Sequence, residues 1–323
     1  MDDAAAVDPA RRLCGEIAWC HAANARAQWM SALDLALSAS ESTTAHRRAA
    51  LGIEVDVRLH PRLGVPVLRH DPFPPIVPSP RSIVHGADTL AVEEGQEEAV
   101  ADSSHTTLDE FARRVADLSV DRGLGPPRRV IVKLDVKDAA SVPLLPHLND
   151  FRCRKMGVNP PPLLQVWFNA DLVGALGHGG TASFPDPMSS LRLATTDRGY
   201  AEHLSIGWSG LPPGPLTRAH YDTMRSFVND AIHSGAMQPS VVRTFTVPIQ
   251  FSRIRVPLST ESEATCSAEQ LVNFLQTDLR LLLPQTPEVS VTFWRGRDEV
   301  ILPDDCDWIE RHFPPGTFVV DLD

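Results

Sequence analysis

Two acidic residues stand two positions apart in an otherwise apolar segment, GIEVDVRL at 52–59. Successive side chains of a β-strand point to opposite faces, so Glu54 and Asp56 are expected on one face and the apolar residues between them on the other. We expect the apolar face to pack under helices and both carboxylates to point into the protein. Buried carboxylates repel each other and lose hydration unless a cation lies between them. The pair predicts a metal or catalytic site, and the alternative is a buried salt-bridge network.

A second segment, VIVKLDVKD at 130–138, repeats the alternation with charges of both signs. Lys133, Asp135 and Lys137 share one face of the predicted strand. Asp135 supplies a third carboxylate, and a set of oxygen ligands favours one divalent cation, Mg²⁺ or Ca²⁺, over zinc. The two lysines would offer positive charge to an anionic substrate. The alternative here is an internal ion pair between lysine and aspartate.

Two histidines stand close to these segments in the sequence. His21 follows the first predicted strand in WCHAAN, and His70 stands in LRHDP. Imidazole changes its charge near neutral pH, so a histidine beside a carboxylate pair and a second histidine is a candidate for acid–base catalysis. The predicted catalytic residues are His21, His70 and Lys137, and the predicted metal ligands are Glu54, Asp56 and Asp135.

Other polar and aromatic residues stand at or near the ends of predicted strands. Side chains at such positions can wall a pocket, although a tryptophan in this kind of fold is more often part of the core. The candidates for substrate binding are Asn24, Lys133, Asn169, Trp208, Trp294 and Asp298.

Strands and helices must alternate to position these residues. Segments rich in β-branched residues predict eight strands, at 16–20, 52–59, 130–136, 163–169, 203–208, 241–249, 289–294 and 317–322. Apolar residues at helical spacing predict helices at 27–38, 107–118, 217–234, 267–283 and 304–313, with Thr107 and Ser267 as N-caps of two of them. This alternation predicts parallel pairing and, for a chain of this length, a single (β/α)8 TIM-barrel domain over residues 1–323.

Two segments interrupt the alternation. Residues 71–105 begin with DPFPPIVPSP and continue through the acidic EEGQEE, which predicts a long, flexible insertion after the second strand. Residues 174–200 are rich in Gly, Ser and Pro, which predicts a loop after the fourth strand. Both insertions would lie on the side where strands lead into helices, and barrels of this type build their active sites there.

The composition argues against several classes of protein. Of 323 residues, 43% are hydrophobic and 22% charged, as in ordinary globular proteins. A net charge of −11 disfavours binding to nucleic acid or anionic membranes, since both are polyanions. No apolar run reaches the roughly 20 residues of a membrane span, and the acidic N-terminus lacks the apolar part of a signal peptide, so we predict a cytoplasmic protein. The five cysteines form no CxxC pair, which predicts reduced thiols and no zinc site.

The chemistry-bearing residues also occur in a familiar order. His21, the Glu54–Asp56 pair, His70 in HDP and the Asp135–Lys137 pair resemble the glycerophosphodiester phosphodiesterase superfamily, which includes the sphingomyelinase D-like phospholipases. A closer resemblance, over nearly the whole chain, is to the menorin family, which shares that barrel. The segments that carry it are IAWCHAANAR, GIEVDVRL, VPVLRHDP, VIVKLDVK, VWFNADLV, LSIGWSG, VTFWRGRDE and VVDLD. This chain has His-Asp-Pro at 70–72, whereas menorin-type sequences commonly have His-Pro-Pro.

The resemblance implies a metal-dependent phosphodiesterase on a barrel of the phospholipase C-like type. The carboxylates would hold the cation, the two histidines would transfer protons, and the substrate would be a phosphodiester: a small molecule or lipid headgroup such as a glycerophosphodiester, lysophospholipid or cyclic phosphate. The attacking oxygen, from water or from the substrate itself, stays open, as does the assignment of base and acid. One alternative is a non-catalytic menorin-type binding protein on the same barrel. Another is a sugar hydrolase, which would use paired carboxylates without the histidines.

Overall fold

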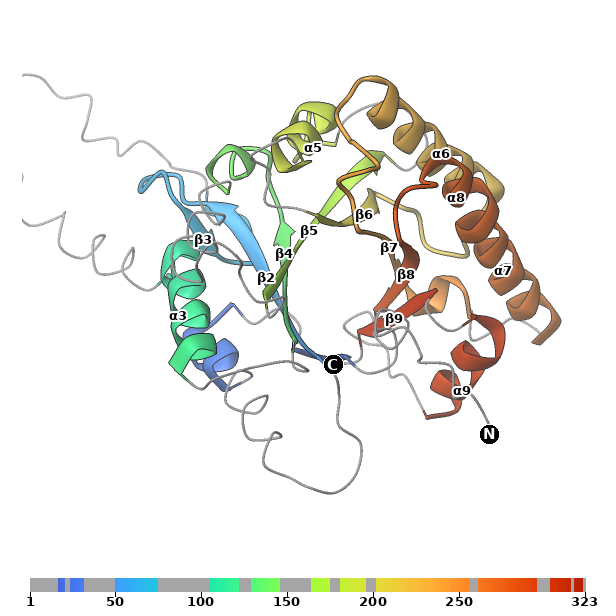
Figure 1. Cartoon of the computed structure of the whole chain (residues 1–323), viewed down its shortest axis with the longest axis horizontal. Coiled ribbons are helices and arrows are strands. Elements are labelled where there is room, and N and C mark those ends of the chain that lie inside the picture. The colour runs from blue at the N-terminus through green and yellow to red at the C-terminus, as the bar shows by residue number, and fades with distance from the viewer. Residues whose placement is uncertain are drawn as a thin grey trace, which may run out of the picture.

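The structure, a computed structural model, describes residues 17–20, 24–31, 50–74, 105–121, 129–145, 164–174, 181–195, 202–255, 261–294, 303–314 and 317–321. Within these residues the fold is mixed α/β. One curved, mostly parallel sheet carries helices on its outer side, and its inner side faces a common centre (Figure 1).

Eight strands follow one another in this sheet in the order of the chain. They are β1 (Ile17–Cys20), β2 (Ala50–Leu59), β4 (Arg129–Val136), β5 (Leu164–Gly174), β6 (His203–Ser209), β7 (Thr244–Gln250), β8 (Glu288–Trp294) and β9 (Phe318–Asp321). Each pairs with its neighbours in parallel, and each overlaps a predicted strand. In the described part of the chain no ladder of hydrogen bonds joins β1 to β9, although Cα atoms of these two strands come within 8 Å.

A short ninth strand, β3 (Pro66–Leu68), runs antiparallel to β2 and forms a hairpin with it. This hairpin matters for the site because it leads the chain back along the end of β2. The amide of Arg69 donates to the carbonyl of Asp56 at 2.9 Å, which places the residues after β3 beside the last residues of β2.

The helices lie between the strands. They are α3 (Leu108–Asp121), α5 (Pro187–Thr195), α6 (Arg218–His233), α7 (Glu261–Asn273), α8 (Arg280–Leu282) and α9 (Pro303–His312). The described residues also contain two 3₁₀ turns, η3 (Val142–Leu144) and η4 (Phe251–Arg253), and a π-helical stretch, η5 (Phe274–Leu279), which joins α7 to α8. Residues 26–31 are also helical. Among the described residues no helix combines the length and apolar character needed to cross a membrane.

The two predicted N-caps have different outcomes, and one helix was not predicted. Thr107 caps α3 as expected, because the amide of Glu110 donates to its hydroxyl oxygen at 3.1 Å. The expectation that Ser267 caps a helix is wrong, since α7 already begins at Glu261. The segment predicted as a loop contains α5, which begins at Pro187 after Asp186 accepts the amide of Ser189 at 3.0 Å. Proline suits the first helical position because a backbone N–H, which proline lacks, would have no partner within the helix there.

The core lies between the outer face of the sheet and the helices. The apolar residues that alternate with the polar ones along β2, among them Ile53 and Val55, are fully buried there. Aromatic rings fill the same layer: Trp29 meets Phe111 edge to face at 5.4 Å between ring centroids. Since the apolar positions take the outer face, the polar positions of the same strands are left on the inner face.

Most of the predicted insertion lies outside the described residues, and only its two ends, 71–74 and 105, can be placed. These ends lie side by side, because the rings of Phe73 and His105 are 5.6 Å apart and both rings approach His60. The amide of Leu68 also donates to the carbonyl of Thr106 at 2.9 Å. The chain therefore leaves and re-enters the fold at one point next to the β2–β3 hairpin.

Candidate metal centre

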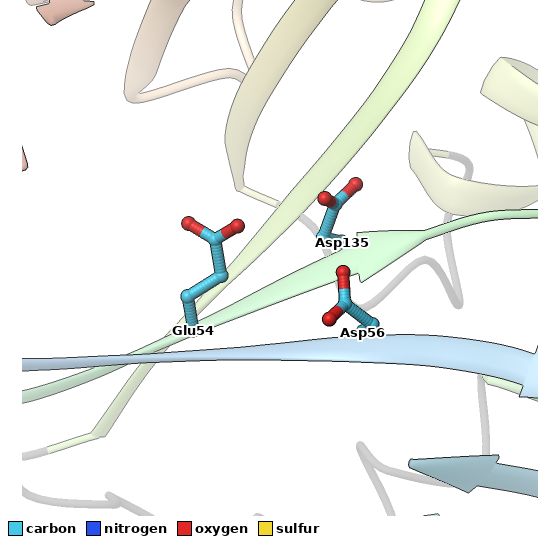
Figure 2. A group of neighbouring side chains, drawn as sticks. All are labelled: Glu54, Asp56 and Asp135. Atoms are coloured by element: carbon cyan, nitrogen blue, oxygen red, sulfur yellow. The ribbon is translucent and has the colours of Figure 1, made fainter. Parts of the chain in front are cut away.

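Three carboxylates gather on the inner face of the sheet. Glu54 and Asp56 come from β2 and Asp135 from β4, and one oxygen of each lies within 4.8 Å of the others. The register explains this, since Asp56 pairs with Asp135 across the two parallel strands. Figure 2 shows the three side chains rising from the two strands on the same side. The three predicted metal ligands therefore lie together.

Two lysines lie among these carboxylates: Lys133 within β4 and Lys137 directly after it. The Lys133 ammonium is 2.6 Å from Glu54 Oε2, and both side chains are only 3% exposed. The Lys137 ammonium contacts Asp56 Oδ1 at 2.9 Å and also Asp135 Oδ2. Three carboxylates and two ammonium groups sum to −3 + 2 = −1, so the lysines compensate the cluster only in part.

The charges of this cluster shift the proton affinity of its members. Burial raises the pKa of the Asp135 carboxyl, and Glu54 and Asp56 raise it further, whereas Lys137 opposes the shift. Burial acts to lower the pKa of Lys137, but the Asp135 and Asp56 charges outweigh it and raise that pKa. Lys137 therefore stays charged at neutral pH, whereas its surroundings shift the Asp135 carboxyl toward the protonated form.

Asn24 holds Asp56 in place through both ends of its side-chain amide. Its Nδ2 donates to Asp56 Oδ2 at 2.5 Å, and its Oδ1 accepts the backbone N–H of Asp56 at 2.8 Å. Asn24 lies in the segment after β1, so this pair of bonds also joins that segment to β2. The sequence placed Asn24 among residues that bind substrate, and the structure shows a residue that positions a carboxylate.

Uncharged polar residues follow Asp135 along one row of register partners on the inner face of the sheet. Asp135 pairs in register with Asn169 on β5, and Asn169 pairs with Ser205 on β6. The row continues through Thr246 on β7 to Ser290 on β8. Asn169 is 6% exposed and both serines are fully buried. Asn169 Oδ1 and the two serine hydroxyls have no hydrogen-bond partner among the described residues. Buried polar atoms are normally paired, so these atoms are available to a bound group.

A fourth carboxylate, Asp171, lies beside this cluster and was not among the predicted site residues. The β5–β6 ladder pairs Ala170 with Ile206 and then Val173 with Trp208, so two residues of β5 oppose Gly207 alone. This arrangement is a β-bulge, which often re-aims a side chain next to an active site. A carboxylate oxygen of Asp171 lies over Gly207, only 2.2 Å from where a Cβ atom at 207 would stand. The sequence did carry a signal, because Asp171 follows Asn169 at the same two-residue spacing as Glu54 and Asp56.

Asp171 reaches solvent at the strand end, but protein atoms and other charges crowd its carboxyl group. Desolvation by these surroundings, followed by the charge of Asp135, raises the pKa of Asp171 to about 7, against the opposing effect of Lys137 and Lys133. At neutral pH the carboxyl is thus divided between its charged and its protonated form. A cation bound nearby would favour the charged form.

This shift predicts how stability depends on pH in the metal-free protein. The pKa of Asp171 is about 7 in the folded protein and 3.8 in the unfolded chain, so the folded state binds the proton more tightly. The stability that this carboxyl contributes is therefore fully present below about pH 3.8 and is lost as the pH rises through 7. We expect the melting temperature of the wild type to fall more steeply between pH 4 and 7 than that of Asp171→Asn. Thermal unfolding in chelator at each pH measures both slopes, and parallel slopes would contradict the assignment.

His70 lies at the rim of the inner face, next to the end of β2. Its ring is 64% exposed, and its Nδ1 is 3.0 Å from Asp71 Oδ1. Its carbonyl accepts the Arg58 Nε–H at 2.8 Å. The backbone thus brings His70 close to Asp56, while the ring contacts the neighbouring Asp71.

The remaining predicted site residues have mixed positions. Trp208 faces the helices: it is 6% exposed, and its indole N–H donates to the carbonyl of His220 in α6 at 3.2 Å, so the structure does not bring it to the site. Trp294 is half-buried at the end of β8, where register pairs it with Gln250. His21 and Asp298 lie outside the described residues.

Comparison with known proteins adds nothing to this geometry. No family model matches the chain, and no curated protein matches it.

Proposed function

We propose that this protein is a metal-dependent, phosphodiesterase-like enzyme on a closed (β/α)8 barrel. Eight parallel strands in chain order, with helices outside, support the barrel, as does the approach of β1 to β9. Active sites of such barrels lie at the C-terminal ends of the strands, and Asp56, Asp135 and Lys137 lie at those ends of β2 and β4.

The three converging carboxylates are the observation that carries the proposal. They fit a divalent cation, because all three offer hard oxygen ligands and the cluster keeps an uncompensated negative charge beside its two lysines. The buried, unpartnered Oδ1 of Asn169 at the same level adds an oxygen that could serve a bound group. Glu54, Asp56 and Asp135 would hold one Mg²⁺ or Ca²⁺.

A bound divalent cation would polarise a non-bridging phosphate oxygen as a Lewis acid. Lys137, 2.9 Å from Asp56 and 23% exposed, can reach the same phosphate and stabilise charge that develops on its oxygens. Lys133 is buried against Glu54, so its role in this scheme is to hold that carboxylate in place. This role replaces the substrate contact expected for Lys133 from the sequence.

His21 and His70 would transfer the protons. One would take a proton from the attacking oxygen, and the other would protonate the leaving oxygen. Asp71 can orient the His70 ring, as an acidic partner orients the histidine of many hydrolytic sites. The substrate class is a phosphodiester, as a small molecule or as a lipid headgroup.

One observation favours a second candidate, a non-catalytic binding protein on the same fold. Each of the three carboxylates already contacts a lysine, as in a structural ion-pair network. In that case the cluster would stabilise the fold and would need no metal.

Cation binding and turnover separate the two candidates. We expect Mg²⁺ or Ca²⁺ to raise the melting temperature, because a ligand that binds only the native state stabilises it. Asp135→Asn should reduce this gain and, with the metal present, abolish turnover of glycerophosphodiesters, lysophospholipids or cyclic phosphates. Calorimetry without divalent binding at millimolar metal, together with no turnover in this substrate panel, would support the non-catalytic candidate.

A further inference from the structure

We propose that Asp171 and Asn169 are ligands of the same cation and make the site selective for Ca²⁺ over Mg²⁺. This inference rests on the proposed function, because it concerns the cation that Glu54, Asp56 and Asp135 would hold. It adds two residues of a third strand, β5, to the metal ligands that the sequence placed on β2 and β4, and it gives Asn169 the role of a metal ligand in place of the substrate contact expected from the sequence.

The position of β5 supports the assignment. Asn169 pairs in register with Asp135, the ligand on the neighbouring strand β4. Asp171 lies one inward position further toward the C-terminal end of β5, and its carboxylate lies over Gly207. Electrostatic interactions couple Asp171 to Asp135, Lys137 and Glu54. Both side chains therefore lie on the inner face of the sheet, the face that carries the three carboxylates.

Asn169 supplies an independent indication of a ligand. Its side chain is more than nine-tenths buried, and its Oδ1 has no hydrogen-bond partner among the described residues. An amide oxygen is a hard, neutral donor of the kind found in many Ca²⁺ sites. A buried oxygen of this type beside three carboxylates is suited to a cation more than to an anion.

The charges agree with one divalent ion. Glu54, Asp56, Asp135 and Asp171 carry −4 when ionised, and Lys133 and Lys137 carry +2, so the six groups sum to −2. Without Asp171 the sum is −1, and a divalent ion would leave an excess of one positive charge. With Asp171 included, a single divalent ion neutralises the site.

The number of oxygens favours the larger ion. Four carboxylates and one amide give five oxygen-bearing side chains, and Ca²⁺ takes six to eight oxygen ligands in flexible geometry. Mg²⁺ requires a near-ideal octahedron, keeps several waters and is usually held by one or two carboxylates. Removal of Asp171 or Asn169 should therefore weaken Ca²⁺ binding more than Mg²⁺ binding.

Gly207 offers a way to displace Asp171 without removing its charge. A Cβ atom at this position would stand 2.2 Å from the Asp171 carboxylate and 3.1 Å from Pro248 Cγ. Gly207→Ala should push the carboxylate away from its present place. If Asp171 is a ligand, this substitution should weaken Ca²⁺ binding although all acidic groups remain.

Titration calorimetry of the full-length protein with Ca²⁺ alone and Mg²⁺ alone tests the proposal. We expect Asp171→Asn, Asn169→Ala and Gly207→Ala each to weaken Ca²⁺ binding by about tenfold or more, and Mg²⁺ binding by less, because ligand charge and number set Ca²⁺ affinity. Asp307→Asn, an exposed aspartate of α9, is the matched control and should bind both ions as the wild type does. Melting curves in chelator identify any variant that fails to fold, and Asn169→Ser provides a second variant at that position.

The outcomes separate this inference from the proposed function. Ca²⁺ affinity unchanged in folded Asp171→Asn and Asn169→Ala, but lost in Asp135→Asn, would overturn the inference and leave the three-carboxylate site intact. Equal losses for Ca²⁺ and Mg²⁺ would overturn the claim of selectivity. A wild type that binds neither ion would remove both the inference and the metal-dependent function.

Discussion

Lys133→Met should lower the free energy of unfolding by about 3–5 kcal/mol, the usual result of removing one partner of a buried ion pair. The Lys133 ammonium and Glu54 Oε2 are 2.6 Å apart, and both side chains are 3% exposed. Methionine fills a similar volume but leaves the Glu54 carboxylate buried without its cation. Urea unfolding in chelator measures the change.

Two further variants make this prediction specific. Glu54→Gln combined with Lys133→Met should recover most of the loss, because no uncompensated charge remains. Lys137→Met should have a smaller effect, since the Lys137 side chain is 23% exposed and water can reach it. Millimolar Ca²⁺ should restore part of the stability of Lys133→Met if Glu54 binds a cation. A loss below about 1 kcal/mol for Lys133→Met would show that Glu54 is protonated or otherwise compensated.

His21→Ala and His70→Ala should each reduce turnover of a phosphodiester by roughly 10²–10⁴-fold, the usual contribution of a positioned proton-transfer group. The His70 substitution should not unfold the protein, since this ring lies exposed at the rim.

His233→Ala serves as the control for these variants. His233 lies at the end of α6, and its ring contacts the carbonyl of Asn229 in that helix, away from the acidic cluster. We expect its turnover to equal that of the wild type. If His70→Ala and the control have the same rate, His70 takes no part in proton transfer, and a residue nearer the carboxylates must do so.

The sequence was sufficient to predict which side chains of β2 and β4 lie on the inner face, because the alternation of side chains along a strand is a local property. Glu54 and Asp56, and likewise Lys133 and Asp135, could be assigned to one face from their spacing alone. Their pairing could not be predicted. The contact of Glu54 with Lys133 depends on the register of two strands that are 79 positions apart, and no local pattern sets that register.

The same rule would have corrected one site prediction and indicated one site residue that was missed. Trp208 alternates with Gly207 and shares a face with Ile206, so the spacing already assigned it to the core. Asp171 shares a face with Asn169, yet it stands in FNADLV, where a bulge follows that no spacing reveals. Helix α5 was missed because its segment is rich in residues that favour turns, although Asp186 and Pro187 form a regular helix start.

The two hydrogen bonds between Asn24 and Asp56 have a consequence for the rate of ion exchange. Asn24 fixes one oxygen of Asp56 at 2.5 Å and its backbone N–H at 2.8 Å, so the carboxylate has lost its rotational freedom before any ion arrives. The entropy cost of ordering this ligand is already incurred when the protein folds, so ion binding does not incur it again. Loss of water from the ion, and not rearrangement of the protein, should then limit the rate of uptake at Asp56. Asn24→Ala would make the Asp56 carboxylate mobile, and rearrangement of the protein would then limit the rate of ion uptake.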